Sequence, residues 1–158
     1  MKKDFFDTMD KIMQNNPNVY LIFVGLGYPR YDALKKKYKD RVINTEASEQ
    51  TALDIAVGLT YENKIPFVYT ITPFLYRGFE TIRTYINHEK LAVKMVGAGR
   101  NDDYGKQDGF SHDATDIKPF FDLLSNIKQY YPETKEELPA IIDQMVNNNL
   151  PCYLNLRR

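Results

Sequence analysis

The 158-residue sequence contains no tryptophan, a single cysteine and no excess of either charge. One cysteine, Cys152, excludes a disulfide within the chain. The 21 basic and 21 acidic residues give a formal net charge of zero, so bulk charge would not hold the chain on nucleic acid or on an anionic membrane. The longest apolar run, 19–24, is far too short to span a bilayer. Acidic residues interrupt the apolar pattern at the start, unlike a signal peptide, so we expect a cytoplasmic protein.

The sequence does contain strand-like and helix-like segments in alternation. Continuous apolar runs predict strands at 19–25, 42–43, 65–70, 91–97, 127–131 and 151–156. Helical spacing of apolar residues predicts helices at 3–15, 31–41, 48–62, 77–87, 117–126 and 135–147. This alternation predicts a single α/β domain over residues 1–158, with a mainly parallel β-sheet and helices on both faces.

The helix predicted from Ser48 carries a carboxylate on its apolar side. On a helical wheel, Glu49 falls in line with Ala52, Leu53 and Ala56. A buried carboxylate is costly unless it has a partner or a raised pKa. An acid in the first helical turn is also favoured by the helix dipole when it is half exposed. From this stretch alone, both interpretations of Glu49 remain open.

Unusual residues follow three of the predicted strands, in the segments Asn44–Glu49, Thr70–Arg77 and Gly97–His112. In parallel sheets, ligands bind beyond the carboxyl ends of the strands. We therefore expect these three segments to meet at one rim and to form a site. The Gly25–Leu26–Gly27 loop lacks the third glycine of a dinucleotide-binding loop, so it predicts only a turn.

Four further pieces stand out by their order and spacing: RVINTEASEQTALDIAVG (41–58), IPFVYTITPFLYRGFETIR (65–83), LAVKMVGAG (91–99) and DGFSHDATDI (108–117). Together they resemble the pyrimidine-binding domain of transketolase-like thiamine diphosphate enzymes. The resemblance implies the thiamine diphosphate-binding fold and a transferase that makes or breaks a C–C bond. That bond would lie next to a carbonyl of a ketose or a 2-oxo acid, which points to carbohydrate metabolism.

The resemblance also implies two cofactor-binding residues. Glu49 matches the glutamate that hydrogen-bonds N1′ of the cofactor's aminopyrimidine ring and thereby activates the cofactor. Phe74 matches an aromatic side chain that packs on the face of the same ring. Glu49 is thus predicted to be catalytic as well as cofactor-binding.

On the substrate side, Asp108 and His112 match residues that reach the substrate, and a histidine is suited to proton transfer near neutral pH. Arg77 and Arg100 are candidates for binding a substrate phosphate, with surface salt bridges as the alternative. A further histidine of transketolases has Ala98 or Gly99 in its place here, which leaves the sugar-phosphate specificity open.

The chain contains no Gly-Asp pair, whereas the other half of the family's cofactor site uses a Gly-Asp-Gly motif to hold diphosphate and metal. The resemblance therefore implies a split enzyme, in which a diphosphate-binding partner subunit holds Mg²⁺ and thiamine diphosphate binds between the two. We expect a homo- or hetero-oligomer with a small-molecule substrate, no nucleic-acid or membrane partner, and no metal site on this chain. Two alternatives remain: a subunit of a split 2-oxo acid decarboxylase, and a non-catalytic binding or assembly module that keeps the fold.

Overall fold

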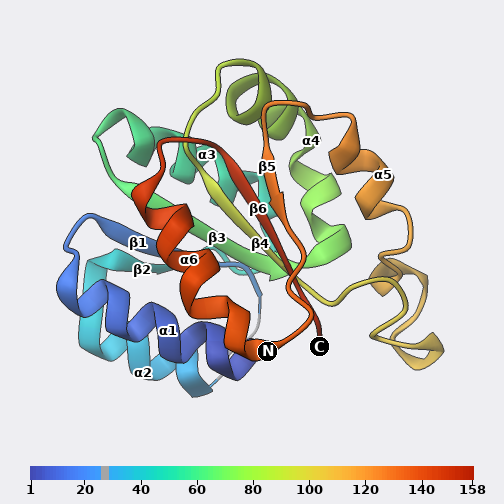
Figure 1. Ribbon diagram of the computed structural model, residues 1–158, viewed down its shortest axis with the longest axis horizontal. Helices are drawn as coiled ribbons and strands as arrows, with labels where there is room; N and C mark the ends of the chain where they lie inside the picture. The colour runs from blue at the N-terminus through green and yellow to red at the C-terminus, as the bar shows by residue number, and fades with distance from the viewer. Residues whose placement is uncertain (26–28) are drawn as a thin grey trace.

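A computed structural model describes residues 1–25 and 29–158 (Figure 1). Its centre is a six-stranded sheet in the order β2-β1-β3-β4-β6-β5, and every neighbouring pair is parallel. The strands are β1 (Val19–Phe23), β2 (Val42–Asn44), β3 (Ile65–Ile71), β4 (Lys94–Ala98), β5 (Lys128–Tyr130) and β6 (Cys152–Leu156). The predicted fold class, a parallel α/β sheet, is confirmed. Residues 26 and 27 of the predicted glycine turn lie outside the described residues.

Helices cover both faces of the sheet (Figure 1). One face carries α1 (Lys2–Asn15), α2 (Pro29–Tyr38) and α6 (Leu138–Asn147). The other face carries α3 (Glu49–Tyr61), α4 (Phe79–Thr81) and α5 (Ile117–Asp122). None of the helices in the described ranges is long and apolar enough to cross a membrane.

Each face of the sheet has its own apolar core because side chains alternate between the faces along a strand. Leu21 and Phe67 pack on the side of α1 and α6. Their chain neighbours Ile22 and Val68 pack on the side of α3. All four are fully buried, and burying a side chain of this size stabilises the fold by about 1.5–3 kcal/mol. The strands of the centre are therefore held from both sides, and only their ends reach the surface.

The segment predicted as a helix over 77–87 differs from a regular α-helix. It begins earlier, as 3₁₀ turns over Thr72–Gly78, passes through the single turn of α4, and continues as a π-helix over Ile82–His88. Pro73 stands at the start of the 3₁₀ segment, where the fixed φ of proline favours helical geometry. The start is thus set beside the end of β3. Such 3₁₀ and π segments are frequent near functional sites.

Candidate functional site

A cleft of about 490 Å³ opens beyond the carboxyl ends of β1, β3 and β4. The three segments predicted to meet at one rim all contribute to its walls, together with the start of α1. The lining residues are Lys2, Phe23, Val24, Gly25, Ala47, Glu49, Tyr69, Ile71, Phe74, Arg77, Ala98, Tyr104 and His112.

Glu49 lines this cleft and is the first residue of α3. Its side chain is 3% exposed, so the half-exposed helix-end interpretation does not hold. The Oε1 atom of Glu49 accepts a hydrogen bond of 2.8 Å from Nη1 of Arg77. The Oε2 atom is buried and has no hydrogen-bond partner among the described residues. A buried carboxylate oxygen without a partner is costly, so this atom has the character of a ligand-binding group.

Phe74 lies next to this ion pair and joins it to the rest of the cleft. The guanidinium carbon of Arg77 sits 4.1 Å from the centroid of the Phe74 ring. The ring of His112 approaches Phe74 with a centroid distance of 5.1 Å and an interplanar angle of 66°. Glu49, Arg77, Phe74 and His112 are therefore brought together, although 63 positions separate the first from the last in the sequence (112 − 49).

Lys2 and Tyr104 extend this row of contacts, and sequence analysis missed both. The ring of Tyr104 lies 5.1 Å from that of His112, and its Oη accepts a hydrogen bond of 3.0 Å from Nζ of Lys2. Among the described residues, Lys2 forms no ion pair with a carboxylate, so its positive charge is available at the wall of the cleft. One residue in the sequence could have indicated that Tyr104 packs here, namely Gly99. It has φ +89° and lies so close to the Tyr104 ring that a Cβ at this position would come within 2.1 Å of the ring.

Arg100 does not line the cleft, and the prediction that it binds a substrate phosphate is not supported. Its side chain is buried, with Nε donating to Oδ1 of Asn155 at 3.1 Å and Nη2 to the Asn155 carbonyl at 2.8 Å. The same guanidinium donates to the Pro132 carbonyl at 2.8 Å and to Oε1 of Glu133 at 2.7 Å. The guanidinium donors of Arg100 are therefore engaged by partners within the fold rather than directed into the cleft.

Two other predicted residues also have partners of their own. Asp108 lies outside the cleft lining, and its Oδ2 accepts a hydrogen bond of 3.0 Å from Nη1 of Arg158. Arg77 does line the cleft, but it pairs with Glu49 and is not left free for a phosphate.

A second hollow of about 540 Å³ is lined by residues of the 102–113 loop and shares His112 with the cleft. His112 therefore faces both spaces.

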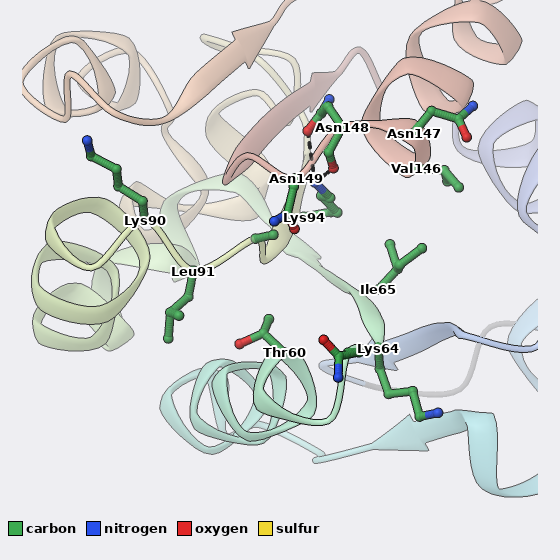
Figure 2. Close-up of a pocket in the computed structure, with 12 residues that line it drawn as sticks. Thr60, Lys64, Ile65, Lys90, Leu91, Lys94, Val146, Asn147, Asn148 and Asn149 are labelled. Carbon is green, nitrogen blue, oxygen red and sulfur yellow. Dashed lines mark hydrogen bonds between the residues drawn. The ribbon is translucent and has the colours of Figure 1, made fainter.

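A third hollow, of about 370 Å³, includes Lys64, Lys90 and Lys94 in its lining (Figure 2). Figure 2 shows the side chains of Lys64 and Lys90 leaving in opposite directions, while Lys94 turns toward Asn148. The Nζ of Lys94 donates to the carbonyl and to Oδ1 of Asn148, both at 3.0 Å, and to the Leu150 carbonyl at 2.6 Å. The three charges do not converge, so this hollow is not a candidate site.

The donor set of the cleft fits an organic ring system better than a metal ion. In residues 1–25 and 29–158 there is no group of three or more His, Cys, Asp or Glu side chains that could hold a metal ion. The buried Oε2 of Glu49 fits a nitrogen of a heterocycle that shares or donates a proton. The ring of Phe74, in the lining of the same cleft, fits a flat aromatic face.

The chain is similar to proteins of a known family over its whole length. The profile of the family "Transketolase, pyrimidine binding domain" matches residues 1–158. A 1-deoxy-D-xylulose-5-phosphate synthase of Dehalococcoides mccartyi (strain CBDB1) is 29% identical over 98% of this chain and 24% of that protein. A subunit of the apulose-4-phosphate transketolase of Actinobacillus succinogenes is 28% identical over 77% of this chain and 39% of that protein.

A solved structure described as "Split gene transketolase, inactive beta4 tetramer" superposes with a TM-score of 0.86 at 25% identity, over 99% of this chain and 50% of that one. The transketolase of Leishmania mexicana, at 17% identity and a TM-score of 0.86, shares the fold. The chain thus spans between a quarter and a half of the length of these proteins. The match over the whole chain nevertheless establishes that it belongs to the family of transketolase pyrimidine-binding domains.

Proposed function

We propose that this chain is the pyrimidine-binding subunit of a split thiamine diphosphate-dependent enzyme of the transketolase type. The observation that carries the proposal is the buried, unpartnered Oε2 of Glu49, in the same cleft as the ring of Phe74. A carboxylate and an aromatic face in one cleft are what an aminopyrimidine ring needs for one hydrogen bond and one stacking contact.

The family and the relatives support the reaction class. Two of them are named as a 1-deoxy-D-xylulose-5-phosphate synthase and as a subunit of an apulose-4-phosphate transketolase. Both names describe work on phosphorylated sugars. We therefore infer that the enzyme makes or breaks a C–C bond next to a carbonyl, in a ketose phosphate or a 2-oxo acid. When bound, thiamine diphosphate supplies the electron sink that such chemistry requires.

Four side chains of the cleft each receive a role in this proposal. Glu49 would share a proton with the ring nitrogen N1′, and its burial, at 3% exposure, keeps water from competing. Phe74 orients the ring by stacking. His112, in contact with Phe74, faces the substrate side and moves a proton there. Lys2, held by Tyr104, attracts the anionic group that a sugar phosphate and a 2-oxo acid have in common.

We assign the diphosphate and Mg²⁺ to a second chain, since no group of three or more His, Cys, Asp or Glu side chains lies together in the part of this chain that the structure describes. This division fits the name of one relative, which is itself a transketolase subunit, and the split-gene description of the superposed structure. A subunit of a split 2-oxo acid decarboxylase would need the same kind of partner. The two enzyme types differ in whether the fragment cleaved from the donor is joined to an acceptor aldehyde or released as a free aldehyde.

The test is reconstitution with a diphosphate-binding chain, to be identified by a Gly-Asp-Gly motif in a neighbouring reading frame. The two chains, with thiamine diphosphate and Mg²⁺, are assayed for transfer from ketose phosphates and for CO₂ release from 2-oxo acids. We expect turnover only when both chains are present, and formation of a new ketose from an added aldehyde acceptor identifies the transketolase type. Absence of cofactor binding by the assembled pair would contradict the proposal and favour a non-catalytic module.

A further inference from the structure

The guanidinium of Arg77 gives the Glu49 carboxylate its one ion pair and its one hydrogen bond among the described residues. Nη1 of Arg77 lies 2.8 Å from Oε1, which is the oxygen that the proposed function does not use. The other oxygen, Oε2, has no partner in the described part of the chain. A carboxylate has two equivalent oxygens that can exchange places by rotation. A partner on one of them therefore determines which oxygen is available to a ligand.

Arg77 is itself fixed by the segment that carries it. Its guanidinium carbon lies 4.1 Å from the centroid of the Phe74 ring. Gly78, the next residue, packs so closely on α3 that a Cβ there would come within 2.2 Å of Cδ1 of Leu53. Leu53 is fully buried, so it has little room to move aside. The glycine thus allows the 3₁₀ segment Thr72–Gly78 to lie against α3, which brings Arg77 to the start of that helix.

The two members of this ion pair differ in their exposure to water. The side chain of Glu49 is 3% exposed and that of Arg77 is 52% exposed. A buried charge without a partner is costly, and burying both members of a pair costs the hydration of each. Here only the carboxylate is buried, because the guanidinium keeps contact with solvent. Glu49 can therefore hold its charge inside the cleft while the balancing charge stays at the surface.

We propose that Arg77 is a positioning residue for Glu49, which holds Oε1 and balances the buried charge so that Oε2 remains the acceptor for the ring nitrogen of the cofactor. The inference rests on the proposed function, and Arg77 acts through Glu49 rather than on the cofactor. Without the guanidinium, the carboxylate is free to rotate and has no balancing charge. The loss should appear in activation of the cofactor more than in its affinity, since the proposed partner chain holds the diphosphate.

The first experiment measures the coupling between the two side chains in the full chain without a ligand. Urea denaturation compares wild type, Arg77→Met, Glu49→Gln and the double variant. We expect Arg77→Met to lower the ratio of folded to unfolded chain at least about tenfold. The same change should have far less effect when Glu49→Gln is already present, because no buried charge then needs balancing. An equal loss in both backgrounds would overturn the inference.

The second experiment uses the reconstituted pair of chains with thiamine diphosphate and Mg²⁺. Exchange of the cofactor's reactive proton is followed by NMR, and the Kd of the cofactor is measured alongside it. We expect Arg77→Met to slow the exchange about 10- to 100-fold and to change the Kd by a much smaller factor. Arg77→Lys keeps a balancing charge for folding but lacks the planar fork of donors, so it should recover part of the exchange rate. Arg83→Met, which removes the same charge from a surface pair with Glu80, should exchange as wild type does.

Three results of the second experiment would overturn the inference. They are a wild-type exchange rate in both Arg77 variants, an equal slowing in Arg83→Met, and a loss of affinity as large as the loss of exchange. The last result would mean that Arg77 only supports the fold of the site. Failure of the proposed function has a different signature. The assembled wild-type pair would then not bind thiamine diphosphate, whereas the coupling of Arg77 and Glu49 in the stability of the full chain would persist.

Discussion

Glu49 is a buried carboxylate, which is an unfavourable position for a charge, and its two oxygens have different environments. Oε1 is paired with Arg77 and Oε2 is not paired within the described chain. Glu49→Gln keeps the size and one acceptor but cannot share a proton with N1′. We expect the reconstituted enzyme to lose about 10²–10⁴-fold in turnover, with a parallel loss in exchange of the cofactor's reactive proton, measured by NMR.

Glu49→Gln should change the stability of the fold very little. The substitution removes a buried charge but leaves Arg77, half exposed to water, without its partner, so the free energy of unfolding should move by no more than about 1 kcal/mol. His112→Ala is the informative comparison. The proposed function gives His112, which contacts Phe74, a role on the substrate side, so this variant should impair turnover and spare proton exchange. Wild-type proton exchange in Glu49→Gln would mean that Glu49 only compensates Arg77.

At the scale of elements, a buried polar network ties the ends of β3, β4 and β6 together behind the cleft. Asn155 of β6 donates to Oγ1 of Thr72 at 2.9 Å and to the Gly99 carbonyl at 3.1 Å, and Arg100 donates to Asn155. Arg100→Met leaves the carbonyls of Asn155 and Pro132 without a donor, so we expect a loss of about 2–4 kcal/mol in unfolding free energy, measured by urea denaturation. A substrate-binding arginine would instead leave stability unchanged and raise KM. Arg83→Met, on the surface, controls for the loss of charge.

The opposite end of β4 provides a pH-dependent prediction. Burial lowers the pKa of Lys94 to about 8 from an ordinary value of 10.5. Between these two pH values the unfolded chain binds a proton that the folded chain does not, so this group adds stability as the pH rises. Below pH 8 the fold carries the cost of a buried charge. The stability of wild type relative to Lys94→Met should therefore increase from pH 8 to 10.5. A difference that is flat with pH would mean that the bonds to Asn148 and Leu150 keep Lys94 charged.

At the scale of the whole molecule, we propose that the chain provides one side of a cofactor site. The described residues offer a carboxylate and an aromatic face, but no cluster that could hold a metal ion with a diphosphate. We therefore expect calorimetry on the isolated chain to show no saturable binding of thiamine diphosphate at micromolar concentration with Mg²⁺. Adding the diphosphate-binding chain should restore binding. A clean micromolar isotherm without that chain would disprove the split site.

Local patterns in the sequence determined the architecture of this protein and one of its key residues. Runs such as 65–70 specify a strand buried on both faces, and their alternation with helical spacing leaves a parallel sheet as the solution. The helical wheel alone put Glu49 on the inner side of α3, because the period of a helix decides which residues share a face. The rim where the strands end follows from the same topology.

The tertiary structure decided which side chains meet there. The contact between Arg77 and Glu49 spans 28 positions, that between Lys2 and Tyr104 spans 102, and that between Arg100 and Asn155 spans 55. No local period encodes such pairs, because they depend on how loops from different strands pack after the sheet has formed. The loop from 99 to 116 has no periodicity, so its sequence could not tell that Arg100 points into the fold while Tyr104 and His112 line the cleft. Periodicity determines which residues share a face within one helix or strand. The position of a long side chain at the rim depends instead on how all the helices, strands and loops pack together.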